Sequence, residues 1–136
     1  MAFSPQTRLV YIPTLEMPMK FSQEPGPARY VPGTYNTETD TAPPDPVADA
    51  ALMKQSPPFV MQSVLKAWDP LAGKAVWQSA PMPWWSGGVL TTAGGLVIQG
   101  AADGVLTVYE ATTGRVLKRI ETGLAIMAPP MTYAID

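Results

Sequence analysis

The acidic residues are the first place to look for chemistry in this sequence. Asp69 and Glu110 could in principle act as an acid–base pair. Both stand at the same position of a repeated segment, just before a turn that contains glycine, so a role in holding the turn is the stronger interpretation. The 136 residues include no His and no Cys. Thiol chemistry is therefore excluded, and we expect no zinc or haem site built from this chain alone.

The two acidic residues belong to a repeat that predicts the fold. LKAWDPLAGKAVW at Leu65–Trp77 recurs as LTVYEATTGRVLK at Leu106–Lys118, 41 positions later. A period of about 40–45 residues with several short strands in each unit is typical of a β-propeller. One blade cannot bury both of its faces and must stack on its neighbours. We expect an all-β fold, a partial β-propeller of about two four-stranded antiparallel blades.

The later unit predicts a complete blade over residues 87–120. Short turns containing glycine separate four apolar segments, because glycine accepts the positive φ that tight hairpins demand. The expected strands are Gly87–Thr92, Leu96–Gly100, Val105–Glu110 and Arg115–Ile120.

The earlier unit predicts a blade interrupted by a long insertion. Residues 1–13 and 59–80 form this blade, and its expected strands are Leu9–Pro13, Ser63–Trp68 and Lys74–Gln78. Residues 14–58 are rich in proline, which breaks strands and helices alike, so we expect a long irregular excursion, either an interaction element or a surface decoration. Residues 121–136 begin a further blade, with Ile126–Tyr133 as its opening strand.

Composition excludes several classes of partner. The net charge is −2 with no basic stripe, so we expect no binding to nucleic acid or to an anionic membrane surface. No run of 18 apolar residues is present, so no membrane span is expected. The N-terminal segment MAFSPQTRLVYIP lacks the charged start and apolar stretch of a signal peptide.

Four segments together resemble one family. They are MAFSPQTRLVYIP, the segment Trp68–Trp77 (similar to A-x-D-x-x-T-G-K-x-x-W), PWWSGG at Pro83–Gly88 followed by TTAGGLVIQGAADG, and APPMTY near the end. In this order they resemble the C-terminal part of the propeller of pyrroloquinoline-quinone-dependent alcohol dehydrogenases. The resemblance implies an eight-bladed parent propeller that holds the quinone in a funnel on its axis, beside a divalent cation that is usually calcium. It also implies hydride transfer from an alcohol to the quinone, cytochrome c as electron acceptor, and a periplasmic location.

The resemblance also implies which residues meet the cofactor. Trp85 is expected to line the quinone site, where an indole offers a flat apolar wall and one N–H donor. Ser86 stands where the family often has Asn, so a main-chain contact is the more secure expectation there. Gly87 lets the backbone come close to a ligand. Trp77 is expected to wedge between adjacent blades and to hydrogen-bond across them, whereas the equivalent Lys118 departs from the pattern.

We assign no catalytic residue and no metal ligand to this chain. The family's catalytic Asp and calcium ligands have no matching positions here, so the chain alone is expected to be inactive and to need the remainder of the propeller. Two alternatives remain open. One is a cofactor-free propeller scaffold that binds protein. The other is a self-standing small β domain, which would leave exposed blade faces and open strand edges.

Overall fold

The computed structural model describes residues 1–16, 22–23, 26–34, 36–37, 39–40, 47, 50, 54, 62–82, 86–133 and 135. The chain divides into two units, which are described separately. The first comprises Met1–Glu16 and Met61–Asp136, and the second Met17–Val60.

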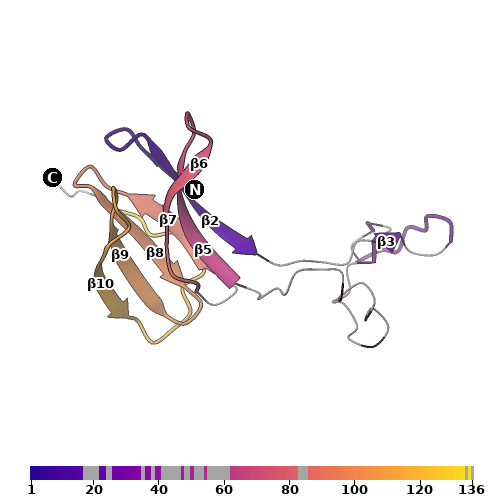
Figure 1. The fold of residues 1–136 in the computed structure, drawn as a ribbon. Coiled ribbons are helices and arrows are strands. Elements are labelled where there is room, and N and C mark those ends of the chain that lie inside the picture. Colours follow the sequence, from indigo (N-terminus) through magenta and orange to yellow (C-terminus); the bar gives the residue numbers. More distant parts are fainter. Residues whose placement is uncertain are drawn as a thin grey trace. The chain divides into compact units, whose positions relative to one another are not determined.

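The first unit contains two four-stranded antiparallel sheets (Figure 1). The first sheet has the order β1-β2-β5-β6, formed by Ala2–Ser4, Leu9–Glu16, Gln62–Asp69 and Lys74–Gln78. The second has the order β10-β9-β8-β7, formed in chain order by Ser86–Thr91 (β7), Leu96–Ala101 (β8), Val105–Glu110 (β9) and Val116–Glu121 (β10). The predicted all-β fold of two four-stranded blades is confirmed.

The two sheets are copies of one another in register as well as in strand order. Trp77 lies opposite Ala67 in the first sheet, and Lys118 lies opposite Val108 in the second. These pairs are equivalent in the 41-residue repeat. The sequence repeat therefore corresponds to a structural repeat, in which one supersecondary unit is built twice.

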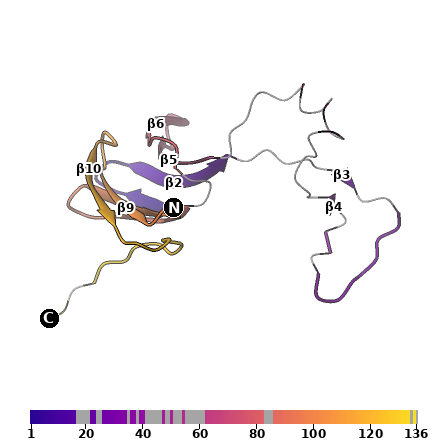
Figure 2. The same cartoon turned by 90° about the horizontal axis from the view of Figure 1, so that it is seen from below.

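The core lies between the two sheets, which pack against each other (Figure 2). Side chains alternate along a strand, so one face of each sheet supplies the core. The first sheet contributes chiefly Leu9, Tyr11, Leu65 and Ala67, and the second Val89, Val97, Tyr109 and Ala111. Burial of each large side chain contributes about 1.5–3 kcal/mol, so the stacking of the sheets is the main source of stability.

One expected strand is not formed. Residues 122–133 contain no strand, so the prediction of a strand at Ile126–Tyr133 is wrong for this structure. A strand requires a paired neighbour. Within this stretch, Ile126 donates a backbone hydrogen bond to Ala101, but no ladder follows. That residues 121–136 open a further blade stays a prediction.

The second unit follows β2. The ladder between β2 and β5 extends to the pair Glu16–Gln62, so both strands are longer than predicted. The insertion therefore begins after Glu16 rather than after Pro13. Within the second unit, β3 (Ser22–Gln23) pairs with β4 (Thr39–Asp40).

Candidate functional site at the start of strand β7

The residues expected to meet a cofactor fall at the beginning of β7. Trp85, the first choice for a cofactor contact, lies outside the described residues, as does Trp84. Ser86 and Gly87 are the first two residues of β7, and Gly87 is buried. The geometry of the site is therefore that of Ser86, the two glycines after it and the segments that touch them.

A β-bulge interrupts the sheet at this point. Ser86 lies opposite Ala101 and Val89 lies opposite Gln99, so Gly87 and Gly88 together face one residue of β8. A bulge of this kind takes main-chain groups out of the regular ladder and turns the strand locally. These main-chain groups are the ones that could bind a ligand here.

The Ser86 hydroxyl is engaged by the other sheet. Its Oγ lies 2.8 Å from Oγ of Ser63, and the Ser63 hydroxyl in turn donates to the carbonyl oxygen of Thr14 at 2.9 Å. Since a serine has one O–H proton, Ser86 must be the donor to Ser63. Ser63 is 1% exposed and pairs with Met82 through both of its main-chain groups. Ser86 can therefore offer a ligand only its oxygen lone pairs or its backbone.

The glycines of the bulge make room for the chain's own C-terminal segment. A Cβ on Gly87 would lie 2.9 Å from the carbonyl oxygen of Ile126, and one on Gly88 would lie 2.5 Å from Cβ of Pro129. On the neighbouring strand, a Cβ on Gly100 would overlap the Ile126 side chain. Glycine is required at these positions because backbone and side chains of residues 126–129 fill the space that a side chain would occupy. The close approach expected for a ligand at Gly87 is made here by the protein itself.

Thr122 fastens the beginning of this C-terminal segment. Its backbone N–H and its hydroxyl both donate to the carbonyl oxygen of Gly104, each at 2.8 Å. Further along, the N–H of Ile126 donates to Ala101 at 3.0 Å. The bulge is thus held from two sides, by Ser63 of the first sheet and by residues 126–129.

Trp77 joins the two sheets at the opposite side of the core. Its Nε1–H donates to the carbonyl oxygen of Ala111 at 2.9 Å, and the Tyr11 hydroxyl donates to the same oxygen at 2.9 Å. The Trp77 ring lies against Gly114, where a Cβ would come within 2.6 Å of it. Burial raises the pKa of Tyr11, so its hydroxyl stays protonated as a donor. The role of Tyr11 was not predicted, because only the stacking of the sheets brings it to Ala111.

Asp69 and Glu110 hold turns, as the sequence predicts. Oδ1 of Asp69 accepts the N–H groups of Leu71 and Ala72, at 2.9 and 3.0 Å. Oε2 of Glu110 accepts the Thr113 hydroxyl at 2.6 Å, and this hydrogen bond is the largest cause of the lowered pKa of Glu110. Neither carboxylate is arranged as one half of an acid–base pair.

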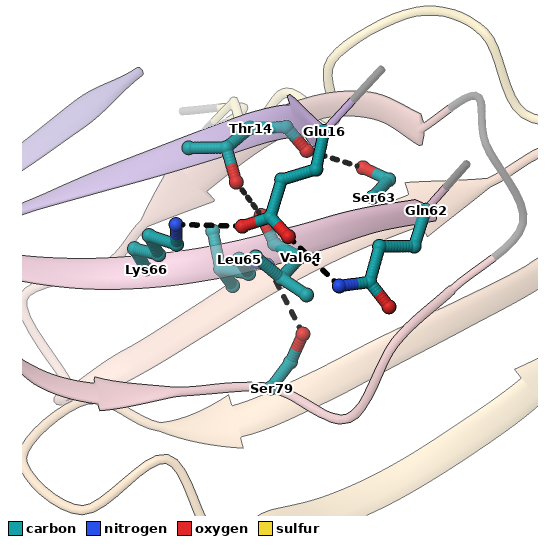
Figure 3. A network of polar contacts seen from close by, with 8 residues as sticks. All are labelled: Thr14, Glu16, Gln62, Ser63, Val64, Leu65, Lys66 and Ser79. Atoms are coloured by element: carbon teal, nitrogen blue, oxygen red, sulfur yellow. Dashed lines mark hydrogen bonds and ion pairs between the residues drawn. The ribbon is translucent and has the colours of Figure 1, made fainter. Parts of the chain in front are cut away.

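A polar network links the last residue of β2 to the beginning of β5 (Figure 3). Lys66 Nζ lies 2.8 Å from one carboxylate oxygen of Glu16, and the Gln62 amide donates to the other at 2.8 Å. Hydrogen bonding to Lys66 is the first cause of the lowered pKa of Glu16. This network holds the C-terminal end of β2 against the N-terminal end of β5, the two strands between which the second unit is inserted in the sequence.

The described residues show neither a metal-binding cluster nor a membrane-spanning helix. Among them, no group of three or more acidic, His or Cys side chains is arranged to hold a metal ion. In the same part of the chain, no helix is long and apolar enough to cross a membrane.

Two stacked four-stranded antiparallel sheets built from one repeat define a segment of a β-propeller. No family model matches the chain. The chain is 40% identical over its full length to a quinohemoprotein alcohol dehydrogenase of Comamonas testosteroni, of which it covers 19%. It is 34% identical, again over its full length, to a 1-butanol dehydrogenase (cytochrome c) of Thauera butanivorans, of which it also covers 19%.

A solved structure gives the same assignment. A quinohemoprotein alcohol dehydrogenase from Pseudomonas putida HK5 superposes with a TM-score of 0.81 at 34% identity, covering 100% of this chain and 20% of that one. These comparisons support a fragment of a pyrroloquinoline-quinone-dependent alcohol dehydrogenase. It spans about a fifth of the length of the relatives it matches.

Proposed function

We propose that this chain supplies one wall of the cofactor funnel of a quinone-dependent alcohol dehydrogenase. The observation that supports this most is the match over the whole chain to a quinohemoprotein alcohol dehydrogenase. When bound, pyrroloquinoline quinone would accept a hydride from the alcohol carbon, since a cofactor of this kind carries the chemistry while the protein orients it. The catalytic Asp and the ligands of a calcium ion would come from the remainder of the propeller.

The start of β7 fits such a role through its main chain. The Ser86 hydroxyl already donates to Ser63, and Gly87 is covered by Ile126 and Ala128. What Ser86 and Gly87 can present to a cofactor is the backbone of the bulge, held in place from both sides. Trp85, directly before the bulge, would add an indole wall and one N–H donor. Ser86 and Gly87 would thus act mainly by positioning and orienting the cofactor through their main chain.

Trp77 is proposed to dock one blade on the next. Its ring contact with Gly114 and its hydrogen bond to Ala111 support this role. Such docking would keep the wall of the funnel rigid, because the wall consists of the inner strands of consecutive blades.

The partners and location are proposed by analogy with the relatives. The Thauera butanivorans relative is named as a butanol dehydrogenase that uses cytochrome c. We extend both ideas to this chain as a small alcohol substrate and a cytochrome c acceptor, and we place the protein in the periplasm.

Quinone titration tests the proposed function. The protein that carries this chain with its complete propeller would be freed of quinone and titrated with pyrroloquinoline quinone and calcium, following tryptophan fluorescence. Trp85→Phe is expected to weaken quinone binding about 3- to 10-fold, because Phe keeps an aromatic ring but lacks the indole N–H, and one hydrogen bond contributes about 0.5–1.5 kcal/mol. Trp68→Phe is the matched control and should leave the affinity unchanged. Equal affinities for both variants would remove Trp85 from the site, and no quenching at all would sink the quinone assignment.

A second function has one observation in its favour. Contacts within the chain account for the Gly87–Gly88 pair and the Ser86 hydroxyl without any cofactor. A cofactor-free propeller that binds protein would need the same packing. In the titration above, the intact propeller would then fold but show no saturable quinone binding.

A further inference from the structure

Gln99 is a buried polar side chain with no protein partner. It lies in β8, is 1% exposed, and neither its Nε2 nor its Oε1 has a hydrogen-bond partner among the described residues. Buried amides are almost always satisfied, and leaving both ends unpaired is costly. Some group must therefore meet this amide.

The amide lies in the layer between the two sheets. Gln99 alternates with the buried Val97 and Ala101 along β8, so it is on the face turned to the first sheet. Its neighbours across the strands are Val89 and Thr107, both buried as well. Thr107 places a hydroxyl on the same face, directly opposite the amide.

Residues on either side of Gln99 make contacts that join the two sheets. Toward Ala101, the Ser63–Ser86 hydrogen bond joins the two sheets. Toward Val97, the Trp77 ring lies 5.9 Å from the ring of Tyr109. Gln99 is buried by this chain alone, so a segment from elsewhere in a larger protein cannot reach it without separating the sheets. A group that meets the amide must therefore lie within this buried layer, between these two contacts.

We infer that Gln99 binds an ordered internal water that links the two sheets. A water is the group that is both small enough and able to donate to Oε1 and accept from Nε2. Such waters usually make about three hydrogen bonds, and the Thr107 hydroxyl is the nearest polar group by register. The site is independent of any cofactor, since it belongs to the packing between two blades.

A crystal structure of the protein that carries this chain tests the inference directly. We expect a solvent peak about 3 Å from Nε2 or Oε1 of Gln99, and its loss in Gln99→Met. Absence of that peak in the wild-type protein overturns the inference, whichever atoms the amide then meets.

Thermal stability gives a second test with the same variant. Met has nearly the shape of Gln and needs no partner, so removing the amide together with its water should leave the melting temperature within about 2 °C of wild type. The exposed Gln78→Met is the matched control. A fall of several degrees for Gln99→Met that the double variant Gln99→Met/Thr107→Val did not recover would show that other protein groups were left unpaired, and would overturn the water site.

Discussion

The two sheets have an equivalent face, called here the leading face, that carries different residues in each sheet. On the first sheet this leading face carries Tyr11, Ala67 and Trp77, which lie side by side across three strands. On the second sheet the equivalent row is Ile98, Val108 and Lys118. Repeat and register are shared, so the comparison isolates the effect of the side chains.

The first leading face carries two aromatic hydrogen-bond donors, and the second has Ile98 and Lys118 in their places. Tyr11 and Trp77 both donate to the carbonyl oxygen of Ala111. Ile98 can donate nothing, and Lys118 is an exposed side chain of the outer strand. The first repeat therefore docks through hydrogen bonds from two buried or half-buried aromatic side chains, whereas the second carries two aliphatic residues and the exposed, charged Lys118. The side chains that join one blade to the next can therefore differ between repeats while the strand order and register stay the same.

Replacing the outer-strand residue should give the largest difference between the repeats. Trp77→Ala removes the ring from Gly114 and leaves Ala111 with one donor fewer, and we expect a loss of about 3 kcal/mol in the free energy of unfolding. Lys118→Ala, at the equivalent position, should change it by less than about 0.5 kcal/mol. Chemical denaturation of the protein that carries this chain measures both. Losses of equal size would show that the two junctions depend equally on the outer strand.

The glycines of the second sheet give a smaller but equally specific effect. Gly100→Ala puts a methyl group into the space of Ile126, and we expect a loss of about 1–3 kcal/mol as the segment is displaced. Gly94→Ala is the control, because its Cβ would meet nothing nearer than the Thr92 hydroxyl at 3.7 Å. Hydrogen exchange at the Ile126 amide should rise in Gly100→Ala only. Unchanged protection there would mean that residues 126–129 do not rest on this glycine.

Much of the fold could be predicted because local signals agree with it. Turns containing glycine and short apolar runs fix the strands of the second sheet, and β6 and β9 have the predicted bounds. β1 was not predicted, because three residues show no alternation. The expected strand at Ile126–Tyr133 failed for the opposite reason, since its sequence is suitable but the described residues offer it no partner strand.

The resemblance selects residues for the candidate site, but the sequence does not reveal their contacts. The resemblance directs attention to Trp85, Ser86 and Gly87, yet it does not reveal that Ser86 donates to Ser63. Ser63 lies in the other repeat, and nothing in its neighbours marks it as a partner. Gln99 is a similar case, because an isolated polar residue in an apolar strand shows its burial only after the sheets stack. Contacts between repeats require the stacking geometry, which periodicity alone does not supply.

The smallest expected effect is a difference in how salt changes the pKa values of two carboxylates, Glu16 in the first sheet and Glu110 in the second. The pKa of Glu16 is lowered chiefly by Lys66, and that of Glu110 chiefly by the neutral Thr113 hydroxyl. Salt screens a charge but not a hydroxyl. Added salt should therefore raise the pKa of Glu16 toward its ordinary value of 4.5 more than it raises that of Glu110. Carboxyl chemical shifts followed by NMR through a pH titration measure both.

The same lowering fixes the sign of the pH effect on stability. A carboxylate with a depressed folded pKa stabilises the fold above its unfolded value and loses that contribution as pH falls through the folded value. Glu16→Gln should therefore be slightly less stable than wild type above about pH 4.5 and converge with it in more acidic solution. Lys66→Met should return the Glu16 pKa toward its ordinary value, whereas Thr113→Val should do so only for Glu110. If Lys66→Met left the pKa of Glu16 unchanged, the link between the ends of β2 and β5 would depend on the hydrogen bond from Gln62 rather than on the ion pair.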